Sequence, residues 1–318
     1  MEKRNNYKAW LYLAPALILM AVFTFFPLVN TIIVSFIENY NSAYGFNAEV
    51  GERVVNTGFT FKNYGVVLGI TPRNPSTGVL DKTFLSFTGP SALGNTLMIT
   101  FITVPISVII ALVISIALNQ IKVLKKFFQT VFFMPYVTNI IAVGMVFSII
   151  FSTNGIFNAM LKSNTNWINV GASYWNSMLI LFVYIIWNAL PYKILIFLSG
   201  LQNIDKQYYD AAKIDGASAF KVARKVTIPL LSPQILYITI TSFIGAFKEY
   251  TAIVGLFNRS YTADGNVHDL FTVVYYIYDK LNSTDQVQYA SAAAVILFII
   301  IMLITLVQMK VAKKRVHY

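Results

Sequence analysis

Long apolar runs alternate with polar segments along the chain. Six of the runs reach the roughly 20 residues that a helix needs to cross the hydrocarbon core of a bilayer. They cover residues 9–37, 91–119, 127–151, 176–199, 233–257 and 290–309. The pattern therefore predicts an all-α integral membrane protein, with six transmembrane helices in a single domain over residues 1–318.

The first run imitates a signal peptide, because it follows Lys3, Arg4 and Lys8. Its uncharged stretch is longer than the apolar region of a signal peptide, and no obvious cleavage site follows it. We therefore expect residues 9–37 to be retained as an anchor helix.

Composition removes several classes of chemistry. Hydrophobic residues make up 57% of the 318 residues and charged residues only 12%, so a bilayer is the natural solvent for this chain. The absence of cysteine excludes disulfides, thiolate metal sites and cysteine nucleophiles. With only His268 and His317 present, we expect no histidine-based metal site or acid–base cluster.

The distribution of charge orients the predicted helices. Of the 24 Lys and Arg residues, 15 fall on the side of the N-terminus and 7 on the other side, while Lys193 and Lys248 lie in or beside spans. Because cytoplasmic loops carry an excess of Lys and Arg, both termini are predicted to be cytoplasmic. The net charge of +11 then requires no nucleic-acid partner. Segments 38–90 and 258–289 lie outside, where they either form a cap, receive a soluble partner or simply connect helices.

The polar segment 200–232 predicts a helical hairpin on the cytoplasmic side. Its pattern indicates, in order, a helix over 207–214, a turn at Asp215 and Gly216, and a second helix over 220–226. Glycine suits the turn, because it adopts left-handed dihedral angles at no steric cost. We expect Pro229 and Pro233 to stop the second helix and to open the fifth span.

The spacing within this hairpin resembles a known motif. The cytoplasmic "EAA" signature of ABC-importer membrane subunits reads Glu-Ala-Ala, three residues, Gly, nine residues, Ile, one residue, Leu-Pro, and is matched here by Asp210, Ala211, Ala212, Gly216 and Pro229. Asp210 replaces Glu, Val226 replaces Ile and Ile228 replaces Leu, with the spacing unchanged. In that family the loop is the lever through which an ATPase moves the transport path. An ordinary basic loop is the alternative interpretation.

The resemblance extends along most of the chain. Further matches are Tyr12-Leu-Ala-Pro-Ala-Leu, Phe26-Pro27-Leu28, Ser35-Phe36, Phe133-Met134-Pro135, Trp187 with Pro191-Tyr192, Gly200-Leu-Gln-Asn-Ile, Leu230-Leu-Ser-Pro and Val274-Tyr-Tyr-Ile-Tyr. In these features the chain is similar to maltose-type and glycerol-phosphate-type carbohydrate-uptake permeases. It departs after the fifth span, where Gly255-Leu-Phe-Asn-Arg-Ser-Tyr replaces the usual Thr-Gly-Gly-Gly-Pro.

The resemblance implies a type I ABC importer permease fold with a cytoplasmic coupling hairpin, in a bacterial plasma membrane. It implies a heterodimer with a second permease, two cytoplasmic ATPase subunits that hold ATP and Mg²⁺, and an extracellular solute-binding protein. This chain itself would bind no cofactor or metal and catalyse no reaction. The implied contacts with the ATPase are Asp210, Ala211, Ala212, Asp215, Gly216 and Pro229. The stretch 89–96 resembles a phosphate loop but has Asn95 where the phosphate-binding Lys belongs.

Two adjacent charges interrupt the fifth run near its middle, at Lys248 and Glu249. Each charge at a bilayer centre costs about 2.5–3.5 kcal/mol. Adjacent residues on a helix do not face each other, so the two charges are poorly placed to neutralise one another. At least one of them should therefore face a polar cavity or a partner on another helix. An interhelical ion pair with a purely structural role is the alternative.

A candidate path for a solute follows from the fourth and fifth runs. Ser242, Gly245 and Glu249 share one face of a helix, where a hydroxyl, a gap and a carboxylate suit a polyol. The resemblance places sugar contacts at Ser242, Gly245, Ala246, Glu249, Ala189 and Tyr192, with Trp187 and Asn188 beside them, and Lys248 completes the predicted path. The structural alternatives are interfacial Trp and Tyr rings, a bend at Pro191, and a Lys193 that snorkels or pairs with an acid.

Together these observations predict the membrane-spanning subunit of an ATP-driven carbohydrate importer, with an oligosaccharide as the expected solute. Glycerol phosphate or another polyol is the alternative solute. An ion-coupled secondary transporter would need inverted halves or broken helices, and the sequence shows neither clearly. A membrane enzyme is disfavoured, because the sequence offers no paired carboxylates, metal ligands or Ser–His arrangement.

Overall fold

The computed structural model describes residues 6–43, 49–50, 53–54, 57–87, 89–121, 125–257 and 270–312. Outside these ranges lie positions 258–261, both histidines, and several basic residues that orient the predicted topology, namely Lys3, Arg4, Lys122, Arg259, Lys313, Lys314 and Arg315. The contacts group the chain into two compact units, residues 1–85 with 276–299 and residues 86–275 with 300–318. The sequence predicts a single transmembrane domain, and this stays a prediction.

The first unit begins with a long apolar helix. It consists of α1 (Asn6–Met20), a π-helical turn η1 (Ala21–Phe25) and α2 (Phe26–Ser35), which follow one another without a break. The wider π turn precedes Pro27, whose nitrogen cannot donate a hydrogen bond to the preceding turn. Nearly all of the described side chains of this helix are exposed. Its surface is therefore suited to contact with lipid or with another apolar helix.

The chain after α2 folds back on the end of that helix. The strands form two small antiparallel pairs, β1 (Ile37–Glu38) with β4 (Thr57–Phe59) and β2 (Glu49–Val50) with β3 (Arg53–Val54). In α3 (Lys62–Val67), Asn63 donates hydrogen bonds to the carbonyl groups of Ser35 and Ile37, at 3.0 and 2.9 Å. The Ser35 carbonyl lies at the end of α2, where no intrahelical donor is available, and Ile37 follows in β1. Asn63 thus fixes this part of the loop to α2.

Two ion pairs hold a later part of the same loop to α14 (Val273–Leu281) and to the turn that precedes α15 (Val287–Ala312). Lys280 lies 3.5 Å from Asp81, and Arg73 donates to Asp285 at 2.7 Å. Burial raises the pKa of the Asp81 carboxyl, but hydrogen bonds from Thr83 and the charge of Lys280 outweigh that effect and lower its pKa overall. Asp81 is therefore ionised at neutral pH, where it attracts Lys280.

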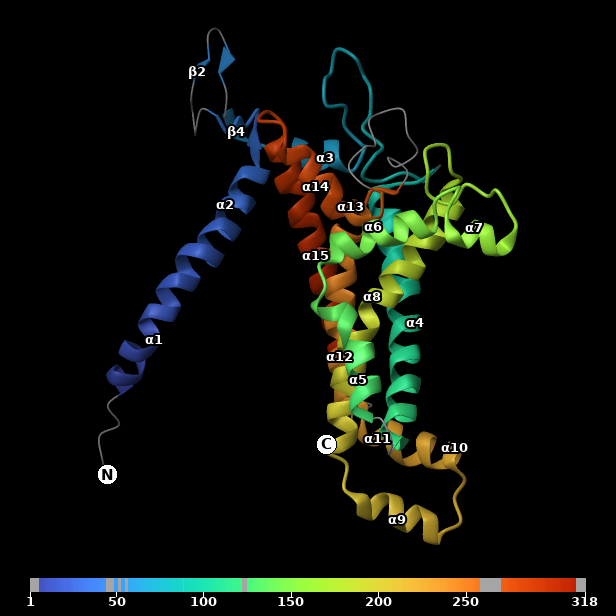
Figure 1. The fold of residues 1–318 in the computed structure, drawn as a ribbon. Helices are drawn as coiled ribbons and strands as arrows, with labels where there is room; N and C mark the ends of the chain where they lie inside the picture. Colours follow the sequence, from blue (N-terminus) through green and yellow to red (C-terminus); the bar gives the residue numbers. More distant parts are fainter. Residues whose placement is uncertain are drawn as a thin grey trace. The chain divides into compact units, whose positions relative to one another are not determined.

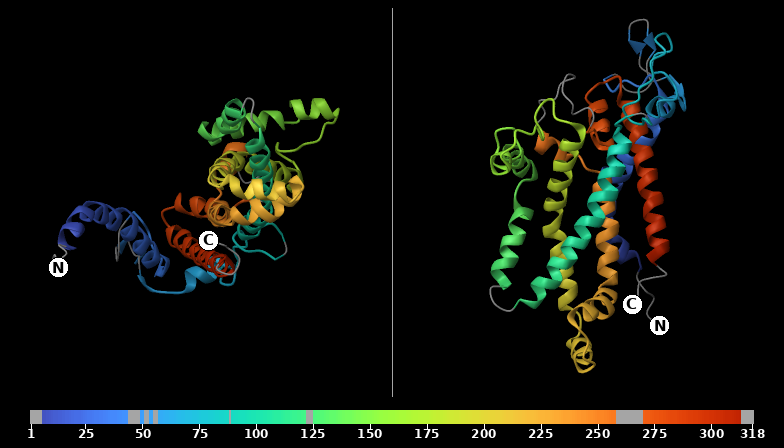
Figure 2. Two further views of the ribbon diagram at one scale, coloured as in Figure 1. Left: turned by 90° about the horizontal axis from the view of Figure 1, so that it is seen from below. Right: turned by 90° about the vertical axis from the view of Figure 1, so that its right-hand side faces the viewer.

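The second unit is built around two long helices, α4 (Ala92–Gln120) and α8 (Tyr174–Gln202). They run side by side, with α12 (Ser232–Phe247) against α4 and α5 (Lys125–Val137) against α8 (Figures 1 and 2). Apolar side chains from these elements form a buried core that includes Val104, Ile194, Phe197, Leu231 and Ile238. The long apolar runs of the sequence thus pack on one another as helices.

The predicted third span is bent. The run 127–151 forms α5 and α6 (Ile140–Ile150), and the two helices meet at 104°. The side chain of Asn139 accepts hydrogen bonds from the N–H groups of Ile141 and Ala142, at 2.9 and 3.3 Å. Asn139 therefore caps α6 and allows a new helix to start in a different direction.

The predicted fifth span is also broken. The run 233–257 forms α12, which ends at Phe247, and α13 (Thr251–Phe257). The prediction that Lys248 and Glu249 lie midway along one helix is therefore wrong, because both residues lie between the two helices. Such a break leaves backbone N–H groups without intrahelical partners.

Four helices are each long and apolar enough to cross a membrane, namely Trp10–Ser35, Ala92–Gln120, Tyr174–Gln202 and Val287–Ala312. The number rises to six if two bent pairs each count as one span, Gln129–Val137 with Ile140–Ile150 and Ala219–Leu230 with Ser232–Phe247. The described part of the chain is therefore a helical membrane protein with four to six candidate spans.

α6 and α13 cross at two glycines. A Cβ atom on Gly144 would lie 2.5 Å from the carbonyl carbon of Gly255, and a Cβ atom on Gly255 would lie 3.1 Å from Cα of Ile141. The two backbones therefore touch, and only glycine fits at position 144 without a shift. Tyr184 of α8 donates a hydrogen bond to the carbonyl of Ile140 and packs in a buried cluster with Ile253 of α13. This contact fixes the crossing against α8, while α7 (Ile156–Leu161) follows α6.

Candidate functional site

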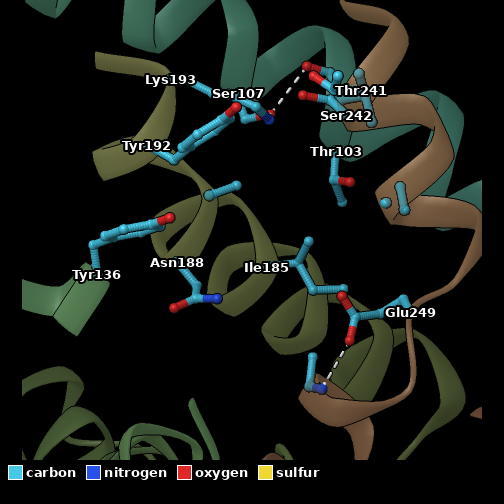
Figure 3. A pocket seen from close by; sticks show the side chains of 15 residues that line it. Thr103, Ser107, Tyr136, Ile185, Asn188, Tyr192, Lys193, Thr241, Ser242 and Glu249 are labelled. Atoms are coloured by element: carbon cyan, nitrogen blue, oxygen red, sulfur yellow. Dashed lines mark hydrogen bonds between the residues drawn. The ribbon is translucent and has the colours of Figure 1, made fainter. Parts of the chain in front are cut away.

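A cavity of about 330 Å³ lies among α4, α5, α8, α12 and the start of α13 (Figure 3). Polar groups face it from several of these helices. Its lining consists of Thr103, Val104, Ser107, Tyr136, Ile185, Asn188, Ala189, Tyr192, Lys193, Thr241, Ser242, Gly245, Ala246, Glu249 and Ala252. Its volume lies within the range of small-molecule sites, at about 300–1,000 Å³.

Seven of the nine residues predicted for the solute path line this cavity. They are Asn188, Ala189, Tyr192, Ser242, Gly245, Ala246 and Glu249. The other two do not line it. Trp187 packs on Phe147, with 5.2 Å between the ring centroids, and Lys248 is exposed beside the break. The structure thus brings together residues from two distant runs, and their contact with a solute stays a prediction.

The contribution of α4 to the cavity was not predicted from the sequence. Thr103 and Ser107 line the cavity, and together with Thr96 and Thr100 they form a buried polar stripe on this helix. Their spacing of three and four residues places them on one helical face. That polar stripe in an apolar run is the signal that could have found them. Thr241 and Tyr136 carried no comparable signal.

Glu249 lies at one end of the cavity (Figure 3). Its Oε1 atom accepts a hydrogen bond from the N–H group of Ala252 at 2.8 Å, and its carbonyl accepts one from the hydroxyl of Thr272 at 2.6 Å. The carboxylate therefore caps the start of α13 and also faces the cavity. Its negative charge is favourable at the N-terminal end of a helix.

Lys193 lies toward the opposite end of the cavity (Figure 3). Lys193 is only 4% exposed, and its ammonium group donates a hydrogen bond to the hydroxyl of Ser107 at 2.5 Å. Among the described residues no acid lies within ion-pair distance of it. Lys193 thus neither pairs with a described acid nor extends to the surface, contrary to both alternatives from the sequence.

Tyrosine rings form another wall of the cavity. The rings of Tyr136 and Tyr192 stack at 6.0 Å between centroids, and the hydroxyl groups of Tyr192 and Tyr237 lie 3.1 Å apart. Aromatic faces suit the C–H surfaces of sugars, while amide, hydroxyl and carboxylate groups bind sugar hydroxyls. The cavity therefore contains the kinds of side chain that bind a polyhydroxylated ligand. Across the described residues, no group of three or more His, Asp and Glu side chains could hold a metal ion.

The polar hairpin projects from one end of the helices that line the cavity (Figure 1). It comprises α9 (Lys206–Ile214), α10 (Ala219–Val222), a π-helical turn η2 (Ala223–Thr227) and α11 (Ile228–Leu230). Asp205 caps α9, because its Oδ1 atom accepts a hydrogen bond from the N–H group of Gln207 at 3.0 Å. Gly216 adopts a φ of +64°, and the N–H of Ala217 returns to the carbonyl of Ala212 at 3.0 Å. The predicted turn at Gly216 is confirmed, because this φ disfavours residues with a Cβ atom.

The hairpin residues implied in ATPase contact differ in exposure. Asp210, Ala211, Asp215 and Gly216 are exposed, Ala212 is buried and Pro229 is half-buried. Asp210 also pairs with Lys213 at 3.5 Å on the surface. Three large exposed side chains, Tyr208, Ile214 and Phe220, were not predicted. Exposed apolar side chains beside an exposed polar motif are typical of a protein-docking surface.

The expectation that Pro229 and Pro233 stop the second hairpin helix and open the fifth span holds to within one residue, because the helix ends at Leu230 and Pro233 lies in the first turn of α12. Helical structure continues through Pro229 to Leu230, and the bend of 68° comes at Leu231, just before α12. The π-helical turn η2 precedes Pro229 and widens the helix where the proline ring would otherwise meet the previous turn. The hairpin therefore leads directly into α12, one wall of the cavity.

One family of known proteins matches most of the chain. The sequence model of the family described as "Binding-protein-dependent transport system inner membrane component" matches residues 104–318. The match includes the whole hairpin and all of the cavity lining except Thr103.

Several relatives align along nearly the entire length. The arabinooligosaccharides transport system permease protein AraP of Halalkalibacterium halodurans is 30% identical over 310 residues, or 94% of this chain and 86% of AraP. The lactose transport system permease protein LacF of Rhizobium radiobacter is 25% identical over 323 residues, or 99% and 97%. The sn-glycerol-3-phosphate transport system permease protein UgpA of Agrobacterium fabrum is 25% identical over 316 residues, or 99% and 97%.

A solved structure shares the fold. It is the crystal structure of a bacterial ABC transporter involved in the import of the acidic polysaccharide alginate. One of its chains superposes with a TM-score of 0.74 and 17% identity, which covers 98% of this chain and 96% of that chain. This chain thus shares its fold with a chain of that ABC transporter.

Proposed function

Because the chain belongs to the family of binding-protein-dependent transport system inner membrane components, we propose that it is the permease subunit of an ATP-driven oligosaccharide importer. Two relatives that align along nearly the whole chain are named as permeases for arabinooligosaccharides and for lactose. The cavity carries the proposal, because it joins stacked tyrosine rings to hydroxyl, amide and carboxylate groups. That mixture suits the C–H faces and the hydroxyl groups of a sugar.

The proposal includes the assembly that the family implies. A second homologous permease completes a heterodimer, two cytoplasmic ATPase subunits hold ATP and Mg²⁺, and an extracellular solute-binding protein delivers the sugar. This chain contributes six spans in a bacterial plasma membrane with both termini in the cytoplasm. The excess of Lys and Arg on the N-terminal side of the predicted topology supports this orientation.

The hairpin is where the ATPase acts in this proposal. It leads through α10 and α11 into α12, which carries Ser242, Gly245 and Ala246 to the cavity. When the ATPase subunits close on each other, the hairpins move together and the cavity opens to the outside. When the subunits separate after hydrolysis, the cavity faces the cytoplasm. The ATPase thus transmits a mechanical force to this chain. In this proposal the chain is a transport subunit and catalyses no reaction itself.

A substitution at Gly216 tests this coupling. The φ of +64° strains any residue with a β-branched side chain, whereas no atom lies within 4 Å of a Cβ atom added there. Gly216→Val therefore distorts the turn without a clash, at a cost of about 1–2 kcal/mol. We expect ATP-dependent uptake of a labelled oligosaccharide into vesicles with the whole importer to fall about tenfold. Gly216→Asn is the matched control, because Asn tolerates this φ, and its uptake should stay within about twofold of wild type.

Two outcomes of the same experiment overturn the proposed function. One is uptake by the wild-type importer that continues when ATP is withdrawn. The other is a wild-type importer that takes up none of the labelled oligosaccharides offered with its binding protein. Equal uptake by the Val and Asn variants would contradict only the proposed role of the hairpin in coupling to the ATPase.

Lys193 favours a second candidate solute, a phosphorylated sugar or polyol. Its buried ammonium group faces the cavity and lacks an acidic partner among the described residues. An anionic group on the solute would supply the missing countercharge. The relative UgpA is named as an sn-glycerol-3-phosphate permease. This observation keeps the phosphorylated solute as an alternative. The broken fifth span is a feature that an ion-coupled transporter would share, but the match to the binding-protein-dependent transport family favours the ATP-driven importer.

Lys193→Met distinguishes the two solutes. If the solute is a neutral oligosaccharide that Lys193 does not contact, because its ammonium group donates to Ser107, uptake by the variant should remain within about threefold of wild type, or about 0.7 kcal/mol. Uptake of labelled glycerol phosphate by the wild type, lost in Lys193→Met, would instead decide for the phosphorylated solute. Competition between the two unlabelled solutes during uptake provides the measurement.

A further inference from the structure

Glu249 lines the cavity from a position outside the helices. It lies between α12, which ends at Phe247, and α13, which begins at Thr251. Its N–H group donates to the carbonyl of Ala246 at 3.2 Å, and its own carbonyl accepts from the hydroxyl of Thr272, 23 positions later in the chain. Contacts with other segments must therefore help to fix the direction in which this carboxylate faces the cavity.

The hydroxyl of Thr272 makes two hydrogen bonds in opposite senses. It donates to the carbonyl of Glu249 at 2.6 Å and accepts from the N–H group of Tyr275, in the first turn of α14, at 3.3 Å. A hydroxyl has one proton, and the bond from Tyr275 occupies a lone pair, so the proton stays directed at Glu249. Thr272 is also fully buried, and its branched Cβ atom restricts rotation of the side chain. The carbonyl of Glu249 thus has a donor of fixed direction.

A ring contact links the next residue to the same segment. The ring of Tyr250 packs on that of Tyr275 with 5.6 Å between centroids, and the ring of Tyr275 stacks on that of Phe271 at 4.6 Å. Two consecutive residues of the break between α12 and α13 are therefore held by the segment 271–275.

This segment is in turn bound to α4. The side-chain amide of Asn95 donates to the carbonyl of Phe271 at 2.9 Å, and the hydroxyl of Thr96 accepts from the N–H group of Val273 at 2.9 Å. Both side chains of α4 are buried, so a broken bond would leave a buried polar group unpaired. The same helix lines the cavity further along its length. A continuous series of hydrogen bonds thus connects α4 to the backbone of Glu249.

We propose that Thr272 is a positioning residue for solute recognition. It fixes the backbone of Glu249 so that the carboxylate faces the solute, while Asn95 and Thr96 hold Thr272 in place. This inference rests on the proposed function, because it requires a sugar that Glu249 contacts. If Thr272 only stabilised the fold, its loss would lower transport independently of the side chain at position 249.

A double-mutant cycle tests the proposal with the whole importer in vesicles and a labelled oligosaccharide. Thr272→Val keeps the shape of the side chain and removes the hydroxyl. We expect the KM for uptake to rise about fivefold, the equivalent of about 1 kcal/mol, with a maximal rate within about twofold of wild type. Thr272→Ser restores the hydroxyl and should bring the KM back to within about twofold of wild type.

The second half of the cycle uses Glu249→Ala as the background. There Thr272→Val should change uptake by less than about twofold, because no side chain at position 249 is left to position. An equal fivefold loss in both backgrounds overturns the proposal, since it would show a structural role alone. If Thr272→Val does not assemble, Thr96→Val removes the acceptor of the Val273 N–H group. It should raise the KM about threefold, again only while Glu249 is present.

Ser115→Ala is the matched control. The hydroxyl of Ser115 is also buried on α4 and donates to the carbonyls of Ala111 and Ile194, at 2.7 and 3.3 Å, but Ser115 does not line the cavity. Its loss should lower stability in denaturant unfolding and leave the KM unchanged. A wild-type importer without oligosaccharide uptake overturns the proposed function and this inference together. Wild-type uptake with an unchanged KM in Thr272→Val overturns this inference alone.

Discussion

Gly144→Ala is expected to destabilise the folded chain by about 3 kcal/mol, near the upper end of the cost of overpacking. The added Cβ would lie 2.5 Å from the carbonyl carbon of Gly255 and 2.8 Å from its Cα. Both neighbours are backbone atoms, so no side-chain rotation can relieve the contact. α6 and α13 must therefore separate, which also disturbs the hydrogen bond from Tyr184 to the start of α6. Denaturant unfolding of the detergent-purified protein measures the change in free energy.

Two other glycines provide matched controls within helices. Gly255→Ala meets Cα of Ile141 at 3.1 Å and should cost about 1 kcal/mol, because a smaller shift relieves this contact. Gly245→Ala meets no atom within 4 Å and should stabilise α12 by up to about 1 kcal/mol through helix propensity. All three changes replace Gly by Ala in a helix and therefore gain the same helix propensity. Differences in stability among the variants thus report the cost of the added Cβ atom at the crossing of α6 and α13. Equal stability of the three variants would show that α6 and α13 separate without cost.

The long helices were predictable because their signals are local. The apolar runs 91–119 and 176–199 become α4 and α8 with nearly the same bounds, since a long uninterrupted run leaves the backbone no alternative in lipid. The turn at Gly216 was also predictable, because a positive φ near the end of a helix favours glycine. Neither feature depends on the rest of the chain.

The breaks within apolar runs were not predicted, although weak signals were present. Asn139 is a good helix cap, but an isolated Asn in an apolar run is equally compatible with a continuous helix. Helical structure runs one residue past Pro229, because the π turn before it accommodates the proline ring. Whether a helix tolerates such a residue depends on packing against other helices, which one sequence does not encode locally.

The cavity lining, too, was predicted only in part. Ser242, Gly245 and Ala246 were placed on the correct wall because the helical period holds up to Phe247. Beyond that residue the period no longer applies, and the exposed Lys248 was wrongly grouped with Glu249 along one helix. Trp187 was included for its chemistry, but it packs on Phe147 instead. The chemistry of the residue types thus predicted most of the cavity lining, whose contact with a sugar stays a prediction, while the orientation of each residue depends on the helix breaks.

Glu249→Gln is expected to lower uptake of a labelled oligosaccharide about tenfold or more, because a hydrogen bond to a charged acceptor contributes about 1.5–3 kcal/mol. Gln retains the shape of Glu and an oxygen that can accept the N–H of Ala252, so α13 stays capped. Glu249→Ala removes both functions, and we expect it to lose a further 1 kcal/mol or so of folding stability as a lost helix cap. Uptake at several solute concentrations, together with denaturant unfolding, separates the two effects.

Lys248→Gln is the matched control, because Lys248 precedes Glu249 directly but is exposed and does not line the cavity. Its uptake should remain close to wild type. A larger loss of uptake in Lys248→Gln than in Glu249→Gln would show that the charge beside the break, and not the cavity carboxylate, matters for transport. Unchanged uptake in Glu249→Gln would leave Glu249 with its structural role alone. In that case the cavity would have to recognise its solute through the tyrosine wall and the hydroxyl groups near Lys193, where the remaining polar contacts lie.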